Sequence, residues 1–398
     1  MKVPFGTMSI SESAKKRISR CLESGNVTCG KYVREFEVEF AKIAGTAHAI
    51  AVSSGTDAVA LALATLLDFG VNRGDAVIVP ALSFVATGNA VLQAGLQPIF
   101  VDVERSTLNI NAGAISASQA RFAKAILPVH LCGKPANVAE LLEIRAAHDH
   151  LYIIDDCAEA YGTRFGSAKP GQFFDMATFS MYAAHTISSI EGGMIATDNM
   201  HYAHALRSLR SHGRACACAS CVLNQGLECK KRFDGGSDSR FRFDRIGFSS
   251  KMNELEAAVG LGNIENYDEI LFLRKRNLTY GLERLEKVSQ FISTFSEGEH
   301  ETIGPHAIPM ILTEDATFTR DELMLYLSLN NIDSRTLFSS MPTQCKGFEF
   351  LGHKLGDFPE AEYIGNNGLH IGCHQGLEIA QLEYAFDKIE EFVGQQQN

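Results

Sequence analysis

The sequence predicts an α/β protein whose large domain holds a mostly parallel sheet flanked by helices, followed by a smaller C-terminal α+β domain. Up to about residue 200, short runs rich in Val and Ile alternate with helical stretches, the pattern of βαβ units. From residue 255 the pattern changes to long helices and a mixed tail. The chain has 398 residues, enough for two domains, and we place them at 1–254 and 255–398.

The expected elements follow in order along the large domain. Residues 10–45 are predicted to be helical, with apolar side chains at helix-like intervals. Strands are expected at 49–52, 76–80, 98–103, 125–131 and 151–156, with helices at 56–69 and 137–150 between them. Residues 215–242 fit neither pattern, because they are rich in cysteine, glycine and charge, and we expect an irregular excursion there. Ligands of such sheets bind at the carboxyl ends of the strands.

Composition argues against two kinds of partner. Lys and Arg number 36 against 47 Asp and Glu, a formal net charge of −11, so neither nucleic acid nor an anionic membrane is expected as a partner. The N-terminal residues lack the apolar core of a signal peptide, and the most apolar stretch, 49–67, is interrupted at 53–57. We therefore expect a cytoplasmic protein without a membrane span.

Two polar motifs stand at predicted strand ends. Ser54, Gly55 and Thr56 open a helix after the strand 49–52, where backbone N–H groups and hydroxyls suit a phosphate. Asp156 ends another strand, where a carboxylate can keep a pyridine nitrogen protonated. Taken singly, each motif is more often a capped helix start or a loop carboxylate. His185 follows Ser180 at the end of a further apolar run, and a lone histidine is usually a surface or core residue.

Eight motifs in order carry a resemblance to a known family: SSGTDAV, PALSFVATGNAV, FVDVERSTLNI, PVHLCGKP, IIDDCAEAYG, FSMYAAHTISSIEGG, LRSLRSHGR and GFSSKMNELEAAVG. The chain resembles the DegT/DnrJ/EryC1/StrS family of PLP-dependent sugar aminotransferases, which have the fold type I aminotransferase-like architecture. The resemblance implies that Ser180 binds the cofactor phosphate. Five residues later the family has the lysine that holds PLP as a Schiff base, and this chain has His185.

Histidine cannot form that Schiff base, but it can act as a general base, with an ordinary pKa of about 6.5. The substitution resembles the nucleotide-sugar 3-dehydratase branch of the family. It implies pyridoxamine phosphate or PLP bound non-covalently, and loss of the C3 hydroxyl from a nucleotide-linked 4-keto-6-deoxyhexose. Phe84 is expected to stack on the cofactor ring and Glu159 to lie beside its 3′-hydroxyl. An aminotransferase using another lysine is the alternative.

Ten cysteines are present, and four crowd together at Cys216, Cys218, Cys221 and Cys229. Their C-x-C pair, and a cysteine before a K-R-F sequence, resemble the 2Fe–2S subtype of 3-dehydratase, typified by the CDP-4-keto-6-deoxyglucose 3-dehydrases, which works with a reductase. The expected ligands are Cys157, Cys216, Cys218 and Cys229. The spacing departs from that subtype, so Cys221 is an alternative ligand. Zinc, or a metal-free enzyme that recycles its cofactor with glutamate, stays open.

The family resemblance also implies a homodimer with shared active sites. Family members complete each phosphate site with a residue from the neighbouring subunit, usually an asparagine in a G-Y-N-x-[RK]-M sequence. Here the corresponding GFSSKM offers Ser249 as the donor, and Lys251 holds the basic position.

Overall fold

The computed structural model describes residues 1–216, 218, 221–225, 228–233 and 236–397. Its centre is a seven-stranded sheet in the order β1-β9-β8-β6-β5-β2-β4. The strands in this order are β1 (His48–Val52), β9 (Gly193–Thr197), β8 (Met176–Ser180), β6 (Tyr152–Asp156), β5 (Ala125–Ile126), β2 (Ala76–Pro80) and β4 (Gln97–Val101). The five strands from β8 to β4 are parallel, and β9 runs antiparallel to both of its neighbours. The prediction of a mostly parallel sheet is confirmed.

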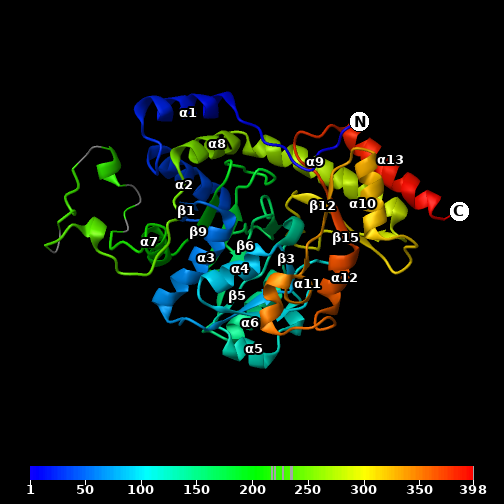
Figure 1. The fold of residues 1–398 in the computed structure, drawn as a ribbon, viewed down its shortest axis with the longest axis horizontal. Helices are drawn as coiled ribbons and strands as arrows, with labels where there is room; N and C mark the ends of the chain where they lie inside the picture. Colours follow the sequence, from blue (N-terminus) through cyan, green and yellow to red (C-terminus); the bar gives the residue numbers. More distant parts are fainter. Residues whose placement is uncertain (217, 219–220, 226–227, 234–235, 398) are drawn as a thin grey trace.

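Helices cover this sheet because their apolar faces bury against it (Figure 1). They are α3 (Gly55–Thr65), α4 (Ala86–Gln93), α5 (Ala117–Phe122), α6 (Val138–Ala147) and α7 (Met200–Leu209). Helix α3 contacts β8, β9, α4 and α7, and its residues from Ala58 to Thr65 are all buried. Two N-terminal helices, α1 (Glu12–Ser24) and α2 (Lys31–Ala44), pack on α8 (Glu254–Ile264).

A second, four-stranded antiparallel sheet has the order β10-β12-β15-β13. Its strands are β10 (Ile292–Ser293), β12 (Ala307–Leu312), β15 (Gly368–Gly372) and β13 (Ser334–Thr336). The helices around it are α9 (Tyr267–Leu285), α10 (Arg320–Leu329), α12 (Pro359–Asn367) and α13 (Ile379–Gln395). Two-residue strands form two further pairs: β3 (Leu82–Ser83) with β14 (Ser339–Ser340), and β7 (Arg164–Phe165) with β11 (Glu301–Thr302). Helix α11 (Met341–Gln344) is a single turn. The C-terminal α+β arrangement agrees with expectation.

The division at residue 254 stays a prediction; a backbone bridge crosses it, and Glu254, at the division itself, contacts the N-terminal helices. Val3 pairs with Ile332, so the N-terminal strand segment lies against the second sheet. Glu254 accepts hydrogen bonds of 2.9 Å from the backbone N–H groups of Gly30, Tyr32 and Val33. This buried carboxylate satisfies the free donors at the start of α2. Helix α8 is thereby tied to the N-terminal helices, and the second sheet begins only at Ile292.

Two expected elements differ in the structure. The helix expected over residues 10–45 is broken into α1 and α2, because Gly25 adopts φ +69° and ends α1 as a left-handed C-cap. The strand expected at 125–131 is regular only at Ala125–Ile126, and Pro128, which has no N–H to donate to a ladder, follows closely. A single bridge between Val129 and Asp156 continues the pairing beyond it.

The described residues of the excursion at 215–242 project from the body beside α7, at the left of Figure 1. Its described residues hold two short 3-10 turns, Val222–Gln225 and Ser239–Phe241, and no strand, so the expectation of an irregular segment is confirmed for them. Among the helices in the described part of the chain, none combines the length and apolarity needed to cross a bilayer.

Candidate functional site

A cavity of about 770 Å³ lies between the carboxyl ends of the parallel strands and the second sheet. Eight of the sequence-predicted residues line it: Ser54, Gly55, Thr56, Phe84, Asp156, Glu159, Ser180 and His185. The opposite wall comes from the second sheet and the N-terminal segment, with Phe5, His306, Met324, Arg335, Phe338 and His370. The position agrees with the rule for open parallel sheets.

One end of the cavity is a cradle of small residues at the start of α3. Ser54 caps the helix by accepting from the N–H of Asp57 at 3.1 Å, which leaves the first N–H groups of α3 at the cavity. A Cβ on Gly55 would lie 2.6 Å from the Cβ of Ser180, so only glycine lets the strand end and the helix start approach this closely. Backbone donors, hydroxyls and the helix dipole together suit a phosphate.

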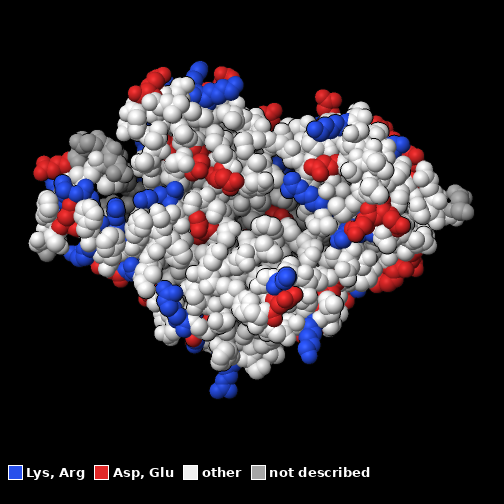
Figure 2. Space-filling view, in the orientation of Figure 1, with Lys and Arg blue, Asp and Glu red and all other residues white. Residues whose placement is uncertain are grey.

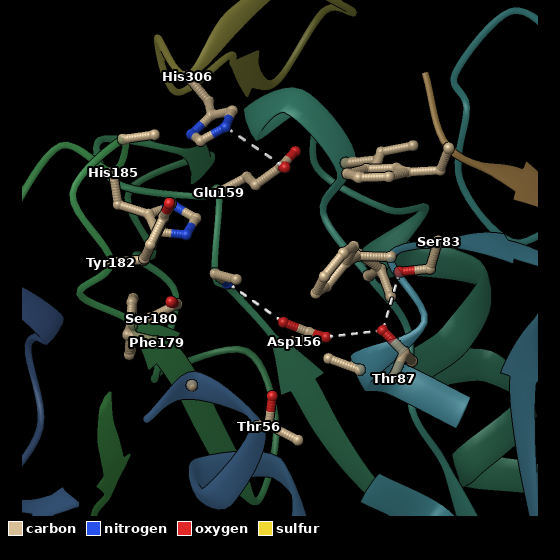
Figure 3. A pocket seen from close by; sticks show the side chains of 18 of the residues that line it. Thr56, Ser83, Thr87, Asp156, Glu159, Phe179, Ser180, Tyr182, His185 and His306 are labelled. Carbon is tan, nitrogen blue, oxygen red and sulfur yellow. Dashed lines mark hydrogen bonds and ion pairs between the residues drawn. The ribbon is translucent and has the colours of Figure 1, made fainter. Parts of the chain in front are cut away.

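Asp156 is aimed into the cavity by a chain of hydroxyls (Figure 3). Its carboxylate accepts from Thr87 Oγ1 at 3.0 Å and from the N–H of Ala158 at 3.2 Å, and Thr87 is hydrogen-bonded in turn to Ser83 Oγ at 2.8 Å. Burial raises the pKa of Asp156. The two donors hold the carboxylate in one orientation, as is needed to bind a ring N–H.

Behind Asp156 lies a closed group that does not line the cavity. His130 Nδ1 accepts from the N–H of Ala136 at 2.9 Å, so Nε2 carries the proton and donates to Asp155 Oδ1 at 2.9 Å. Possible ligand atoms of His130, Asp155 and Cys157 lie within 4.8 Å of one another, the only such group of three or more among the described residues. Burial raises the pKa of the Cys157 thiol well above its usual value, and the nearby carboxylates add to the shift.

Glu159 joins the two walls. Its carboxylate accepts from the N–H of Cys132 at 2.6 Å and lies 3.3 Å from His306 Nε2, a contact drawn in Figure 3. Burial raises the pKa of Glu159 to about 7. Burial lowers the pKa of His306 well below its usual value, with His185 and Arg274 adding to the effect. Glu159 is thus the carboxyl group in this contact that titrates near neutral pH.

His185 lies beyond the end of β8, next to His306, with ring centroids 5.1 Å apart. Nδ1 is buried without a partner, and neither ring nitrogen forms a hydrogen bond to any residue that the structure describes. Burial, together with the charges of Arg274 and Arg335, lowers the pKa of His185 to about 3. The imidazole is therefore neutral near pH 7 and able to accept a proton.

Arg274 fixes the backbone under both histidines. Its guanidinium donates to the carbonyls of Ala184 and His185 at 3.3 Å and to those of Pro305 and His306 at 3.4 Å. It also donates to Gln375 Oε1 at 2.9 Å. This side chain is fully buried in helix α9 and joins the loop after β8 to the loop before β12. It acts as a positioning residue for the two rings.

Several predicted residues do not meet in this chain. Ser249 is exposed, pairs with Ser211 in an isolated bridge, and does not line the cavity. Among the described residues, Cys157 groups with His130 and Asp155, and no group of three or more possible ligands includes a cysteine of the excursion. Cys216 and Cys229 are half-buried, and Cys218 and Cys221 are exposed. Burial raises the pKa of Cys216, and its neighbours Cys218 and Cys221 raise it further.

Sequence reasoning missed residues that line the cavity or lie directly behind its lining. Thr87 and His130 lie inside the motifs PALSFVATGNAV and PVHLCGKP, so the motifs pointed at their segments without assigning them a role. Arg274, His306, Arg335 and His370 come from the C-terminal part, where no spacing pattern links them. Only the packing of the second sheet against the strand ends brings these four together.

Comparison with known proteins gives a consistent picture. Residues 8–390 match the DegT/DnrJ/EryC1/StrS aminotransferase family. The chain is 32% identical to dTDP-4-dehydro-2,6-dideoxy-D-glucose 3-dehydratase of Saccharopolyspora spinosa, covering 98% of this chain and 86% of that one. It is equally 32% identical to GDP-perosamine synthase of Caulobacter vibrioides, covering 89% of this chain and 88% of that one.

The fold has a solved counterpart. A crystal structure of GDP-4-keto-6-deoxymannose-3-dehydratase with bound GDP-perosamine superposes with a TM-score of 0.86 at 27% identity, covering 98% of this chain and 100% of that one. The fold type I aminotransferase-like architecture expected from the sequence is thereby confirmed. The chain belongs to the DegT/DnrJ/EryC1/StrS aminotransferase family.

Proposed function

We propose that this member of the family is a 3-dehydratase of a nucleotide-linked 4-keto-6-deoxyhexose, working with pyridoxamine phosphate or PLP held without a covalent link. The observation that carries the proposal is His185, whose neutral ring has no hydrogen-bond partner among the described residues, at the position where the family has its lysine. None of the described residues that line the cavity is a lysine. Relatives named as 3-dehydratases support this reaction class.

The cavity fits a pyridoxal-type cofactor. Ser54, Thr56 and Ser180 surround the N-terminus of α3, where they would hold the phosphate. Asp156, fixed by Thr87, would hold the proton on the pyridine nitrogen. Phe84, which is 58% exposed at the cavity and 5.8 Å from Phe338 between ring centroids, would stack on the ring.

A bound pyridoxamine-type cofactor would supply an amine that condenses with a ketone and a ring that takes up electrons. His185 then accepts a proton at Nε2, since Nδ1 is buried. Arg274 keeps the ring in place through the His185 carbonyl, and its charge disfavours the protonated ring. The proton is therefore held weakly and is available to the C3 hydroxyl as it leaves. Glu159 would lie beside the 3′-hydroxyl of the cofactor.

A lysine-restoring variant tests the non-covalent link. Wild-type protein loaded with PLP and treated with borohydride should carry no covalent adduct by mass spectrometry, and His185→Lys should carry one per chain. The matched control is His201→Lys on the exposed face of α7, which should carry none at residue 201. An adduct on the wild-type chain would contradict the proposal and favour an aminotransferase that uses another lysine, a function the family name and the perosamine synthase relative suggest.

The reaction itself is tested with a panel of 4-keto-6-deoxyhexoses linked to dTDP, GDP and CDP. The expected product, from at least one of them, is the 3-deoxy ketone, which has lost one oxygen atom; for each molecule formed, one bound pyridoxamine phosphate would be converted to PLP and one ammonia released. A product that has gained an amino group in place of the ketone would contradict the dehydratase assignment.

We further propose that the excursion holds a 2Fe–2S cluster that receives electrons from a reductase partner. Four thiols within fourteen residues supply enough ligands for such a cluster. Cys221 suits the fourth position better than Cys157. Its thiol lies near enough to Cys216 to raise the pKa of that residue, whereas Cys157 lies in the core beside His130.

Iron analysis of anaerobically purified single variants distinguishes these ligands. Roughly two irons per chain are expected for the wild type. Serine at 216, 218, 221 or 229 should lower the iron content strongly, while Cys157→Ser and the distant control Cys345→Ser should retain it. Loss of iron in Cys157→Ser would restore that residue as a ligand. A wild-type protein without iron, yet active with glutamate, would identify the metal-free subtype, and zinc in its place would identify a structural site.

A homodimer with shared sites is part of the proposal, because Ser249 is exposed and is not among the residues that line the cavity between the two sheets. Large apolar side chains are exposed just before it: Phe241, Phe243 and Ile246. Mixing His185→Asn with Ser249→Asp after refolding should regain activity, since one site in each heterodimer is intact. Absence of complementation, or a monomer by light scattering, would contradict shared sites.

A further inference from the structure

The mouth of the cavity carries a cation on the wall opposite the cofactor cradle. Arg335 lies in β13, directly across from His370 in β15, and both side chains line the cavity. Its guanidinium carbon lies 3.9 Å from the centre of the Phe5 ring, and that ring is 4.9 Å from His370. Stacking on Phe5 restrains the guanidinium plane and leaves its N–H edge free.

Arg335 is not neutralised within the described part of the chain. No hydrogen bond or ion pair joins its guanidinium to a described residue, and the residue is exposed. Other arginines that stack on aromatic rings do have acidic partners: Arg105 is bound by Glu314 and Glu360, and Arg284 by Asp387 and Glu390. In a chain of net charge −11, an arginine held in place without a carboxylate is available for an anionic ligand.

The charges of the cavity point to the same conclusion. Among its described lining residues, Arg335 is the only arginine or lysine, while Asp156, Glu159 and Glu191 are acidic. The cradle for the cofactor phosphate uses hydroxyls and a helix N-terminus, so it needs no arginine. Arg335 lies near enough to His185, His306 and His370 to lower the pKa of each. It therefore belongs to the side of the cavity where the substrate meets His185.

We infer that Arg335, stacked on Phe5, is the binding residue for the diphosphate of the nucleotide-linked substrate. The inference rests on the proposed function and adds the place of the nucleotide: the sugar faces His185 and the diphosphate crosses the mouth at β13. Arginine suits this role because its planar fork can donate two parallel hydrogen bonds to one phosphate.

The test is a double-mutant cycle between the arginine and the terminal phosphate. Binding of UDP, GDP, CDP and dTDP, and of the matching monophosphates, is measured by calorimetry on the PLP-loaded full-length protein. Wild type should prefer the best diphosphate to its monophosphate by about 10- to 100-fold, the range of a charge-assisted hydrogen bond. In Arg335→Gln this preference should fall below about threefold, and Arg335→Lys should retain part of it.

Arg121→Gln is the matched control, because Arg121 is exposed on α5 and does not line the cavity. It should bind like the wild type, and PLP absorbance should be the same in every variant. An unchanged diphosphate preference in Arg335→Gln would overturn the inference and leave the proposed function standing. Glutamate is titrated into the same variants. If Arg335→Gln weakens glutamate binding but leaves diphosphate binding intact, the inference is overturned in favour of a carboxylate site. Failure of wild type to bind any of these nucleotides would remove both the inference and the proposed substrate class.

Discussion

The cavity and the excursion hold their reactive groups in opposite ways. In the cavity, Asp156 is oriented by Thr87 and the N–H of Ala158, and Glu159 by the N–H of Cys132 and by His306. In the excursion, the described cysteines are half-buried or exposed, and their sulfur atoms do not gather within ligand distance in groups of three. Basic and acidic side chains are interspersed at this end of the molecule in the view of Figure 2.

The difference shows which part of the structure fixes the reactive groups in each region. Buried donors and acceptors of the cavity are fixed by the sheet ends, so a cofactor would meet a site already arranged for it. Thiols on an irregular segment have no such support, and a metal would have to gather them as it binds. Changes in the cavity should therefore alter chemistry without unfolding the excursion, and changes in the excursion should leave the cavity intact.

The largest effect is expected from His185→Asn, which removes the proposed proton acceptor from the cavity. Dehydration should slow by about 10³- to 10⁴-fold, in the upper range for loss of a general base. PLP binding, followed by absorbance titration, should stay within about threefold of wild type. Single-turnover rates with His201→Asn as the control measure the loss, and a rate within tenfold of wild type would show that another group is the base.

Asp156→Asn should come next. It keeps the shape and the hydrogen bond from Thr87 but removes the negative charge that we propose would face the pyridine nitrogen. A loss on the order of 100-fold in turnover is expected, the size seen when one charged stabilising contact is removed. Thr87→Val should give a smaller loss of about tenfold through the orientation of Asp156 alone. Equal losses in the two variants would indicate that orientation, not charge, matters at Asp156.

Glu159→Gln should change the pH dependence of stability. The pKa of Glu159 is about 7 in the folded protein against 4.5 ordinarily, so between these values the folded chain keeps a proton that the unfolded chain has lost. Stability of the wild type should therefore fall as pH rises from 4.5 to 7 and level off above. Urea unfolding of the cofactor-free proteins is measured at pH 5 to 8. Across that window the free energy of unfolding of Glu159→Gln should rise relative to that of the wild type by about 1–3 kcal/mol. Parallel pH curves would contradict the raised pKa.

The smallest effect is expected in the folded body when metal is removed from the excursion. Dialysis against a chelator should abolish any iron absorbance while PLP affinity stays within about twofold. The stability of the core should change by less than about 1 kcal/mol, because none of the described residues of the excursion belongs to the main hydrophobic clusters. A large drop in stability, or loss of PLP, would show that the two regions are coupled.

Much of the fold followed from the sequence. Strands at β1, β2, β4 and β6 and helices at α3 and α6 were predicted from runs of Val and Ile alternating with helical periodicity. These elements are buried on both faces or on one side, so their patterns are local and strong. The break at Gly25 and the short β5 were missed, since single residues in a continuous apolar pattern decided them.

The sequence alone also placed Ser54, Asp156, Ser180 and His185 on one wall of the cavity, because each stands at a strand end or just beyond one, and parallel strand ends meet at one edge. Tertiary structure alone decided the opposite wall. Arg274, His306 and Arg335 lie up to 150 residues from His185 along the chain, and only the packing of the second sheet brings them to it. Local patterns report backbone geometry and burial, whereas contacts across such separations depend on how two sheets dock, which no spacing encodes.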